Sequence, residues 1–171
     1  MRDRFDDFVA ERLDRLLRYA TALTCDPHLA QDVVQETLLR AQHRWSRIAG
    51  LAAPESYVRK MITNEYLSWR RLRSSRNVAA AHSTLDALAT PVADPAEHFA
   101  ERDAMRSRIA ALPRKQRAAI VLRFYSDCTD AEIAEVLGCS AGTVRSHISR
   151  ALSTLRTAER SRRVSVTEAL S

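Results

Sequence analysis

Two amphipathic segments separated by a tight turn lie within residues 129–156, and they constrain the fold more than any other stretch of the chain. Thr129 followed by Glu132 has the spacing of a capping box, in which both side chains bond backbone N–H groups at the start of a helix. Gly138 suits the left-handed position that ends a helix, and Ser140 can cap the next one. The pattern therefore predicts a short helix, a turn and a longer helix, which together form a helix-turn-helix.

The longer of these two predicted helices has an apolar side and a polar side. The apolar residues recur at helical spacing and are expected to face inward: Val144, Ile148, Ala151, Leu152 and Leu155. The opposite side is short-chained apart from its cations, and contains Thr143, Arg145, Ser146, His147, Ser149 and Arg150. Such a face can approach the major groove of DNA, where Arg pairs with a guanine edge or a phosphate. A solvated basic helix has the same pattern, so this segment alone leaves both interpretations open.

The composition favours helices and a polyanionic partner. The 171 residues include only three Gly and five Pro, and the net charge is +6 with a pI of about 9.8. The three cysteines, Cys25, Cys128 and Cys139, have no metal-ligand spacing and fit a reduced cytoplasm. The start of the chain has no signal-peptide pattern, and no apolar stretch approaches the ~20 residues of a membrane span. We therefore expect a cytoplasmic protein with no membrane contact, no metal and no other cofactor.

Apolar residues at helical spacing predict three helices in the first half of the chain. They span about residues 5–23, 27–47 and 55–73. Asp26 can cap the second helix, and Pro27 suits its first position. Gly50 and Pro54 mark residues 48–54 as a loop.

Residues 77–98 interrupt the helical pattern and contain Pro91 and Pro95, so they are interpreted as a flexible linker. Helical spacing resumes at Phe99, and Pro113 separates two further helices before the helix-turn-helix. The expected fold is all-α, with two small helical domains joined by the linker and the helix-turn-helix in the second. The domain boundaries are 1–76 and 99–160; the last helix ends near residue 157, and residues 161–171 form a polar tail that frays.

The stretch of residues 56–76, which contains most of the third predicted helix, is strongly basic, with one acid, Glu65, among its cations: Arg59, Lys60, Arg70, Arg71, Arg73 and Arg76. Cations at both ends can follow a phosphate backbone, and Asn64 between them is of a type that can read a base edge. Tyr66 and Trp69 could stack on unpaired bases. A place in the core is the preferred interpretation for both rings.

The second predicted helix has a polar outer face with one large apolar residue. Its members lie off the apolar stripe: Asp32, Gln35, Glu36, Leu39 and Arg40. This face suits protein docking, although a plain solvated surface has the same composition.

These pieces follow one another in a single order: "DPHLAQDVVQETLLRAQHRW", "PESYVRKMITNEYLSWRRLR", the linker, and "LPRKQRAAIVLRFYSDCTDAEIAEVLGCSAGTVRSHISRALSTLR". The chain resembles the extracytoplasmic-function group of bacterial sigma factors over about residues 5–156, and is most similar to the SigE-like branch of high-GC Gram-positive bacteria. The resemblance implies a protein that binds core RNA polymerase and directs it to promoters. It implies that the first domain docks on the beta-prime clamp helices and opens the minus-ten element. The second would read the minus-thirty-five element as duplex and sit on the beta flap tip.

The resemblance also implies roles for individual residues. The pattern that contacts the clamp helices is matched by Asp32, Gln35 and Glu36. The minus-ten recognition helix is matched by Asn64, with Arg70 and Arg71 at its basic end, and the segment that holds a flipped-out base by residues 48–54. The minus-thirty-five recognition positions are matched by Thr143, Arg145, Ser146 and Arg150. His147, assigned to the same surface, replaces a commonly basic residue, and Gln42 stands where many members have Trp.

Other functions account for the sequence less well. A dimeric helix-turn-helix activator needs a receiver or ligand domain in front, and residues 1–76 resemble neither. A protein-interaction module without DNA binding does not explain the basic recognition helix. A nucleic-acid enzyme needs a catalytic set, and the sequence contains no nucleotide-hydrolysis motif or paired catalytic carboxylates, so we expect no enzymatic activity. An anti-sigma factor is a further candidate partner, which the chain itself does not indicate.

Overall fold

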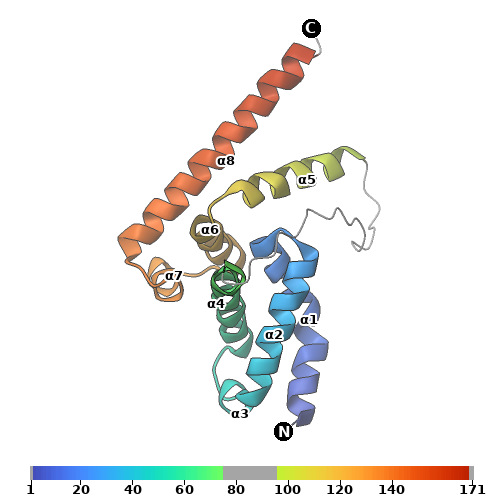
Figure 1. The fold of residues 1–171 in the computed structure, drawn as a ribbon, viewed down its shortest axis with the longest axis vertical. Helices are drawn as coiled ribbons and strands as arrows, with labels where there is room; N and C mark the ends of the chain where they lie inside the picture. Colours follow the sequence, from blue (N-terminus) through green and yellow to red (C-terminus); the bar gives the residue numbers. More distant parts are fainter. Residues whose placement is uncertain (1, 75–95, 170–171) are drawn as a thin grey trace.

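The computed structural model describes the backbone of residues 2–74 and 96–169, and the side chains of residues 4–68 and 103–157. Every regular element in these ranges is an α-helix, which confirms the predicted all-helical fold. The elements are α1 (Arg2–Thr24), α2 (Pro27–His43), α3 (Trp45–Ile48), α4 (Pro54–Ser74), α5 (Ala96–Ala111), α6 (Arg114–Ser126), α7 (Asp130–Leu137) and α8 (Ala141–Ala169). Figure 1 shows α1–α4 gathered around the N-terminal end of the molecule, with α8 extending away from them.

The first group of helices packs around one buried core, in which α1 contacts α2 and α4, and α2 contacts α4. The predicted cap of α2 is confirmed. Asp26 Oδ1 accepts hydrogen bonds from the backbone N–H groups of His28 (2.9 Å) and Leu29 (3.2 Å), and Pro27 is the first residue of the helix. This cap fixes the point at which the chain reverses, so that α1 and α2 lie side by side.

The second helix ends earlier than its apolar spacing predicts. Instead of continuing to about residue 47, it breaks at Arg44 (φ −117°, ψ 14°), and the short α3 follows. Trp45 turns into the core here, with its ring centroid 5.2 Å from that of Phe5 and 4.7 Å from that of Phe8. Packing of this large ring overrides the local preference for a continuous helix.

The second group of helices follows the predicted punctuation. Pro113 precedes α6, and Thr129 and Glu132 form the capping box of α7, with the Thr129 backbone N–H donating to Glu132 Oε2 at 2.8 Å. Gly138 ends α7 in the left-handed conformation (φ 62°, ψ 47°), where a side chain would be strained. Ser140 Oγ accepts a hydrogen bond from the Thr143 N–H at 3.1 Å and so caps α8. The helix-turn-helix is therefore present as predicted.

Both boundaries of the second group differ from expectation. The helix α5 begins at Ala96, before the predicted start at Phe99; residues 77–95 of the predicted linker lie outside the described residues. The helix α8 continues to Ala169, so the predicted end of this helix near residue 157 is wrong. Residues 158–169 contain neither Gly nor Pro, so nothing in the sequence stops the helix near residue 157.

The two groups of helices pack directly against each other through Arg117 of α6. This guanidinium is 8% exposed and donates hydrogen bonds across the boundary to the carbonyl oxygens of Leu23 (3.1 Å) and Thr24 (3.2 Å) at the end of α1. It also donates to the carbonyls of Ala110 and Leu112 in its own half. One cation thus satisfies carbonyl groups that the ends of α1 and α5 leave without helical partners.

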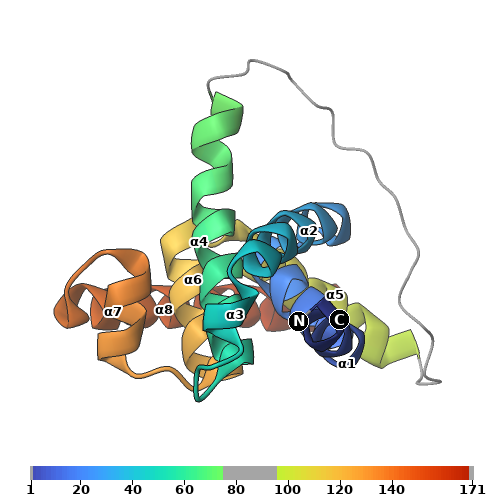
Figure 2. The same ribbon diagram turned by 90° about the horizontal axis from the view of Figure 1, so that it is seen from below.

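Aromatic rings extend this contact between the halves. Tyr19 of α1 is fully buried; its ring centroid lies 5.5 Å from that of Tyr125 in α6, and its hydroxyl is 2.7 Å from Thr63 Oγ1 in α4. Burial raises the pKa of Tyr19 to about 12. The guanidinium of Arg59 faces both tyrosine rings, at 5.6 Å from Tyr19 and 5.5 Å from Tyr125. Figure 2 shows the result: α4 and α6 lie in the centre, between α7 and the pair α1 and α2.

Candidate functional site

The polar side of α8 is presented to solvent. Val144 and Ala151 are buried against the rest of the helix-turn-helix, which turns the intervening residues outward. The exposed residues are Thr143, Arg145, Ser146, Ser149 and Arg150. Five of the six residues that the sequence assigned to this side are therefore exposed together on one helix.

His147 is the exception. It is half-buried, and its Nδ1 is fully enclosed without a hydrogen-bond partner among the described residues. Burial, followed by the positive charges of Lys115 on α6 and Arg150, lowers the pKa of His147, so the ring is neutral near pH 7. A neutral, half-buried imidazole adds no cation to the outward face.

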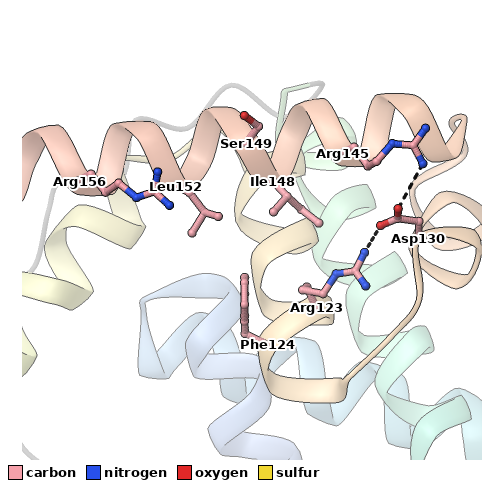
Figure 3. A pocket seen from close by; sticks show the side chains of 8 residues that line it. All are labelled: Arg123, Phe124, Asp130, Arg145, Ile148, Ser149, Leu152 and Arg156. Atoms are coloured by element: carbon pink, nitrogen blue, oxygen red, sulfur yellow. Dashed lines mark hydrogen bonds and ion pairs between the residues drawn. The ribbon is translucent and has the colours of Figure 1, made fainter.

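The side chain of Arg145 is 68% exposed and forms an ion pair. Its Nη1 lies 3.4 Å from Oδ2 of Asp130, the first residue of α7. The other oxygen of Asp130 bonds Arg123 of α6. Figure 3 shows the carboxylate between the two guanidinium groups.

A groove of about 440 Å³ lies beside this ion pair, between α6 and α8. Its apolar lining comes from Phe124, Ile148 and Leu152, and its charged rim includes Arg123, Asp130, Arg145 and Arg156. Phe124 is 63% exposed and stands at the groove in Figure 3. A large exposed ring beside an apolar groove is typical of a protein-contact surface.

Asn64 lies on α4 and is exposed, while its neighbours are held in the core. Thr63 is fully buried under Tyr19, and Glu65 is buried and bonded to Arg40 of α2 at 2.6 Å. Tyr66 is 2% exposed, which confirms the interpretation of this ring as core. The amide of Asn64 is thus exposed on a helix whose neighbouring residues are held against α1 and α2.

The basic end of α4 contains Arg70 and Arg71, whose side chains lie outside the described residues, as does that of Trp69. Their backbone belongs to α4. The predicted loop at residues 48–54 is reduced to residues 49–53, because Ile48 is buried in α3 and Pro54 opens α4.

The outer face of α2 carries the remaining predicted group. Asp32 and Gln35 are exposed, and Glu36 is half-buried with its Oε1 bonded to Arg40 Nε at 3.0 Å. Leu39 is 50% exposed beside them. An exposed Leu among polar groups gives this face the composition of a docking surface.

Sequence reasoning missed Asp130 and Phe124 on these surfaces, and Arg117 in the contact between the two groups of helices. Asp130 resembles an ordinary first-turn acid, Phe124 an ordinary core ring, and Arg117 one cation among many. Their roles depend on residues brought together by the fold, and helical spacing relative to Ile120 and Val121 places Phe124 on the apolar face, so the sequence gave no signal that its ring is exposed.

Two further properties can be read from the described residues. No helix within residues 2–74 or 96–169 has the length and apolar character needed to cross a membrane. Among the side chains that the structure describes, no group of three or more His, Cys, Asp or Glu is placed to hold a metal ion.

Two family models match the chain in succession. The model described as Sigma-70 region 2 matches residues 8–76, and the model described as Sigma-70, region 4 matches residues 102–155. The first match contains the faces of α2 and α4, and the second contains the helix-turn-helix.

Curated relatives match nearly the whole chain. RNA polymerase sigma-E factor of Streptomyces coelicolor is 36% identical over 152 residues, which are 89% of this chain and 84% of the relative. The protein of the same name in Streptomyces avermitilis is 38% identical over 152 residues, covering 89% and 83%. ECF RNA polymerase sigma factor SigL of Mycobacterium tuberculosis is 32% identical over 157 residues, covering 91% and 86%.

Two solved structures share the fold. The sigma factor RpoE of Bartonella quintana, crystallised with the anti-sigma factor NepR, aligns with a TM-score of 0.70 at 23% identity, covering 92% of this chain and 97% of that one. CnrH, solved with the cytosolic domain of CnrY, aligns with a TM-score of 0.57 at 20% identity, covering 94% and 90%. At these identities the likeness concerns the fold alone.

Proposed function

Because the chain belongs to the extracytoplasmic-function group of sigma-70 family RNA polymerase sigma factors, and so directs transcription initiation, we propose that its three exposed helix faces divide this work. The face of α2 docks on core polymerase, that of α4 contacts the minus-ten element, and that of α8 reads the minus-thirty-five element. The observation that carries the proposal is the exposure of these three faces on the segments that match regions 2 and 4.

The docking face combines charge and apolar contact. Asp32, Gln35 and Glu36 provide acceptors for a basic partner, and Leu39 provides apolar area. We assign this face to the beta-prime clamp helices. Arg40 bonds both Glu36 of α2 and Glu65 of α4. These bonds hold the α2 face against α4, so the face keeps its conformation when a partner binds.

On α4, Asn64 is the base-reading candidate. Its amide can donate to and accept from a base edge, and the fixed helix limits the entropy lost on contact. Arg70 and Arg71 are proposed to bind phosphates next to it, and residues 48–54 to hold an unstacked base.

On α8, Thr143, Arg145, Ser146, His147 and Arg150 are proposed to meet the minus-thirty-five element. Arg145 lies early in the helix, where a recognition helix points at base edges, and Arg150 lies where the helix passes a phosphate. The groove at Phe124 is proposed as the contact with the beta flap, because its apolar floor and charged rim suit an amphipathic helix.

The remaining assignments follow from this role. Sigma factors are non-catalytic regulators, so the polymerase supplies the chemistry and the chain needs no cofactor. We place the protein in the cytoplasm with the polymerase and promoter DNA, and propose an anti-sigma factor as a further partner. Residues 1–76 and 99–160 act as two domains joined by residues 77–98. A dimeric activator is not favoured, because residues 8–76 match region 2.

The test is reconstitution with core RNA polymerase. We expect the chain to bind core polymerase and to support run-off transcription from selected promoter fragments. In Gln35→Ala/Glu36→Ala, core binding should weaken while the free energy of unfolding changes by only about ±0.5 kcal/mol, because Gln35 is exposed and Glu36 loses only a solvent-accessible ion pair with Arg40.

Asp7→Asn is the matched control, since Asp7 is an exposed acid on α1 and not on α2. Core binding by the control should equal that of wild type. If the double variant also binds like wild type, the docking face is not on α2.

A further inference from the structure

A carboxylate lies where the helix-turn-helix needs positive charge. Asp130 is at the start of α7, and its two oxygens bond cations from two other helices, Arg123 of α6 and Arg145 of α8 (Figure 3). The side chains of Asp130 and Arg123 are 29% and 31% exposed, so both are half-buried. The Arg145 side chain is 68% exposed, so it is the most accessible of these three bonded groups.

The bond from Arg123 to Asp130 determines where the second oxygen of this carboxylate points. Arg123 extends from α6, whose buried face is packed in the core, and holds one oxygen of Asp130. The second oxygen therefore points toward α8, where it takes up Nη1 of Arg145 at 3.4 Å. A guanidinium has five N–H donors, and reading guanine uses two of them, so Arg145 can keep this bond and contact a base edge at once.

We infer that Asp130 is a positioning residue that sets base specificity at the minus-thirty-five element by orienting Arg145. The inference rests on the proposed function of Arg145. Holding a long side chain before DNA arrives removes part of the conformational entropy that binding would otherwise cost. An oriented guanidinium also aligns its N–H donors with the acceptors of one base pair better than with those of the others.

The same carboxylate has an opposite effect on affinity. A negative charge near the DNA surface opposes the phosphates, so it weakens binding to every sequence. Asp130 is therefore expected to lower general affinity and to raise discrimination. A residue with a purely structural role would change both in the same direction, and this difference in sign makes the inference testable.

The experiment uses the reconstituted holoenzyme and promoter fragments varied one base pair at a time across the minus-thirty-five element. In Asp130→Asn, the ratio of affinities for the preferred and the other base pairs at the position read by Arg145 should fall about two- to fivefold, the range that an exposed ion pair supports. Binding to a fragment with an unrelated minus-thirty-five element should rise. If the ratio stays at its wild-type value, or if all fragments lose affinity equally, the inference is overturned.

Glu135→Gln is the matched control, because it removes one negative charge from the same helix at an exposed residue that forms no ion pair within the described residues. It should raise general affinity and leave the ratio unchanged. Asp130→Ser is the second variant, since it also removes the carboxylate and leaves the Thr129–Glu132 cap of α7 in place, and it should lower the ratio as Asn does. Thermal unfolding of each variant shows that α7 is intact.

A double variant separates this inference from the proposed function. In the Arg145→Ala background, Asp130→Asn should have no further effect on the ratio, because the oriented group is absent. If Arg145→Ala alone leaves base preference intact, the proposed role of Arg145 is wrong and that of Asp130 fails with it. If Arg145→Ala relaxes the preference and Asp130→Asn does not, only the role of Asp130 is wrong.

Discussion

The two helices proposed to contact DNA, α4 and α8, are held in very different ways. Neighbours enclose α4 on three sides: Thr63 bonds Tyr19 of α1, Glu65 bonds Arg40 of α2, and the Tyr66 ring lies 4.2 Å from the guanidinium of Arg114 on α6. In contrast, α8 packs on α5, α6 and α7 and leaves one polar side open.

This difference teaches where folding and recognition are coupled. Changes at the buried residues of α4, such as Thr63, Glu65 and Tyr66, remove a buried contact, so they alter stability as well as binding. Changes on the outward side of α8 remove no buried contact, so they should alter binding alone. The second half of the chain also supplies part of the cover on α4, through Arg114 and Tyr125. Four predictions test this comparison, beginning with the largest expected effect.

Arg117→Met should have the largest effect on stability, because it weakens the contact that holds α6 against α1 and α4. The variant leaves four carbonyl oxygens without their charged donor, so we expect the free energy of unfolding to fall by about 2–4 kcal/mol. Urea unfolding measures this. Arg114→Met is the control, because a cation facing a ring contributes only about 0.5–1 kcal/mol when partly exposed. Equal stability of both variants would show that the contact at Arg117 contributes nothing particular.

Arg145→Ala and Arg150→Ala sharpen the comparison on the open side of α8. Arg145→Ala should cost about 1–3 kcal/mol at one promoter position and relax the preference there. Arg150→Ala should weaken binding to all sequences and reduce the salt slope by about one. Holoenzyme binding to promoter variants at several salt concentrations separates the two, and stability should be unchanged in both. An identical, sequence-blind loss would make α8 a backbone-contacting helix.

Asn64→Ala tests the one exposed position between buried neighbours on α4. The loss should be about 1 kcal/mol in open-complex formation, the contribution of one hydrogen bond, with no change in stability. On a template already unpaired at the minus-ten element, the loss shrinks if Asn64 aids melting and persists if it reads a base. Wild-type output on both templates would remove Asn64 from the site.

His147 should give the smallest effect, and it is the one outward-assigned residue of α8 that is coupled to stability. Burial lowers its pKa below the ordinary His value, so protonation favours the unfolded state. Stability is then full above the unfolded-state pKa of about 6.5 and falls as the pH drops from there through the lowered pKa of the folded state. The unfolding midpoint of wild type should fall more between pH 7.5 and 5.5 than that of His147→Gln. The same decrease in both would place the titrating group elsewhere.

The sequence predicted what depends on near neighbours. Asp26, Gly138 and the pair Thr129 and Glu132 act within one helical turn, so their spacing was sufficient to place three helix ends. Inward and outward residues of α8 followed from helical spacing, except for His147. That ring is enclosed beside α6, which carries Lys115, and a single helix does not reveal its neighbour.

What the sequence could not predict depends on partners far along the chain. The Arg117 side chain bonds carbonyls 93 and 94 residues away, and such backbone acceptors exist at every residue. Trp45 ends α2 because of rings in α1, and Asp130 meets Arg145 only because the turn at Gly138 brings α8 back across α7. Local pattern gives the elements, whereas these contacts follow from how the elements pack.

The packing of α7 against both α4 and α8 has a consequence for the reach of the molecule. Neighbouring helix axes lie about 8–10 Å apart, so α4 and α8 are separated by about 20 Å here. Two elements centred about 25 base pairs apart are separated by about 85 Å along DNA, at about 3.4 Å per base pair. If α4 and α8 contact both elements at once, as proposed, the contact at Arg117 must first open. Apparent promoter affinity then equals the intrinsic affinity multiplied by the open fraction, and each 1.4 kcal/mol in that contact lowers this fraction about tenfold.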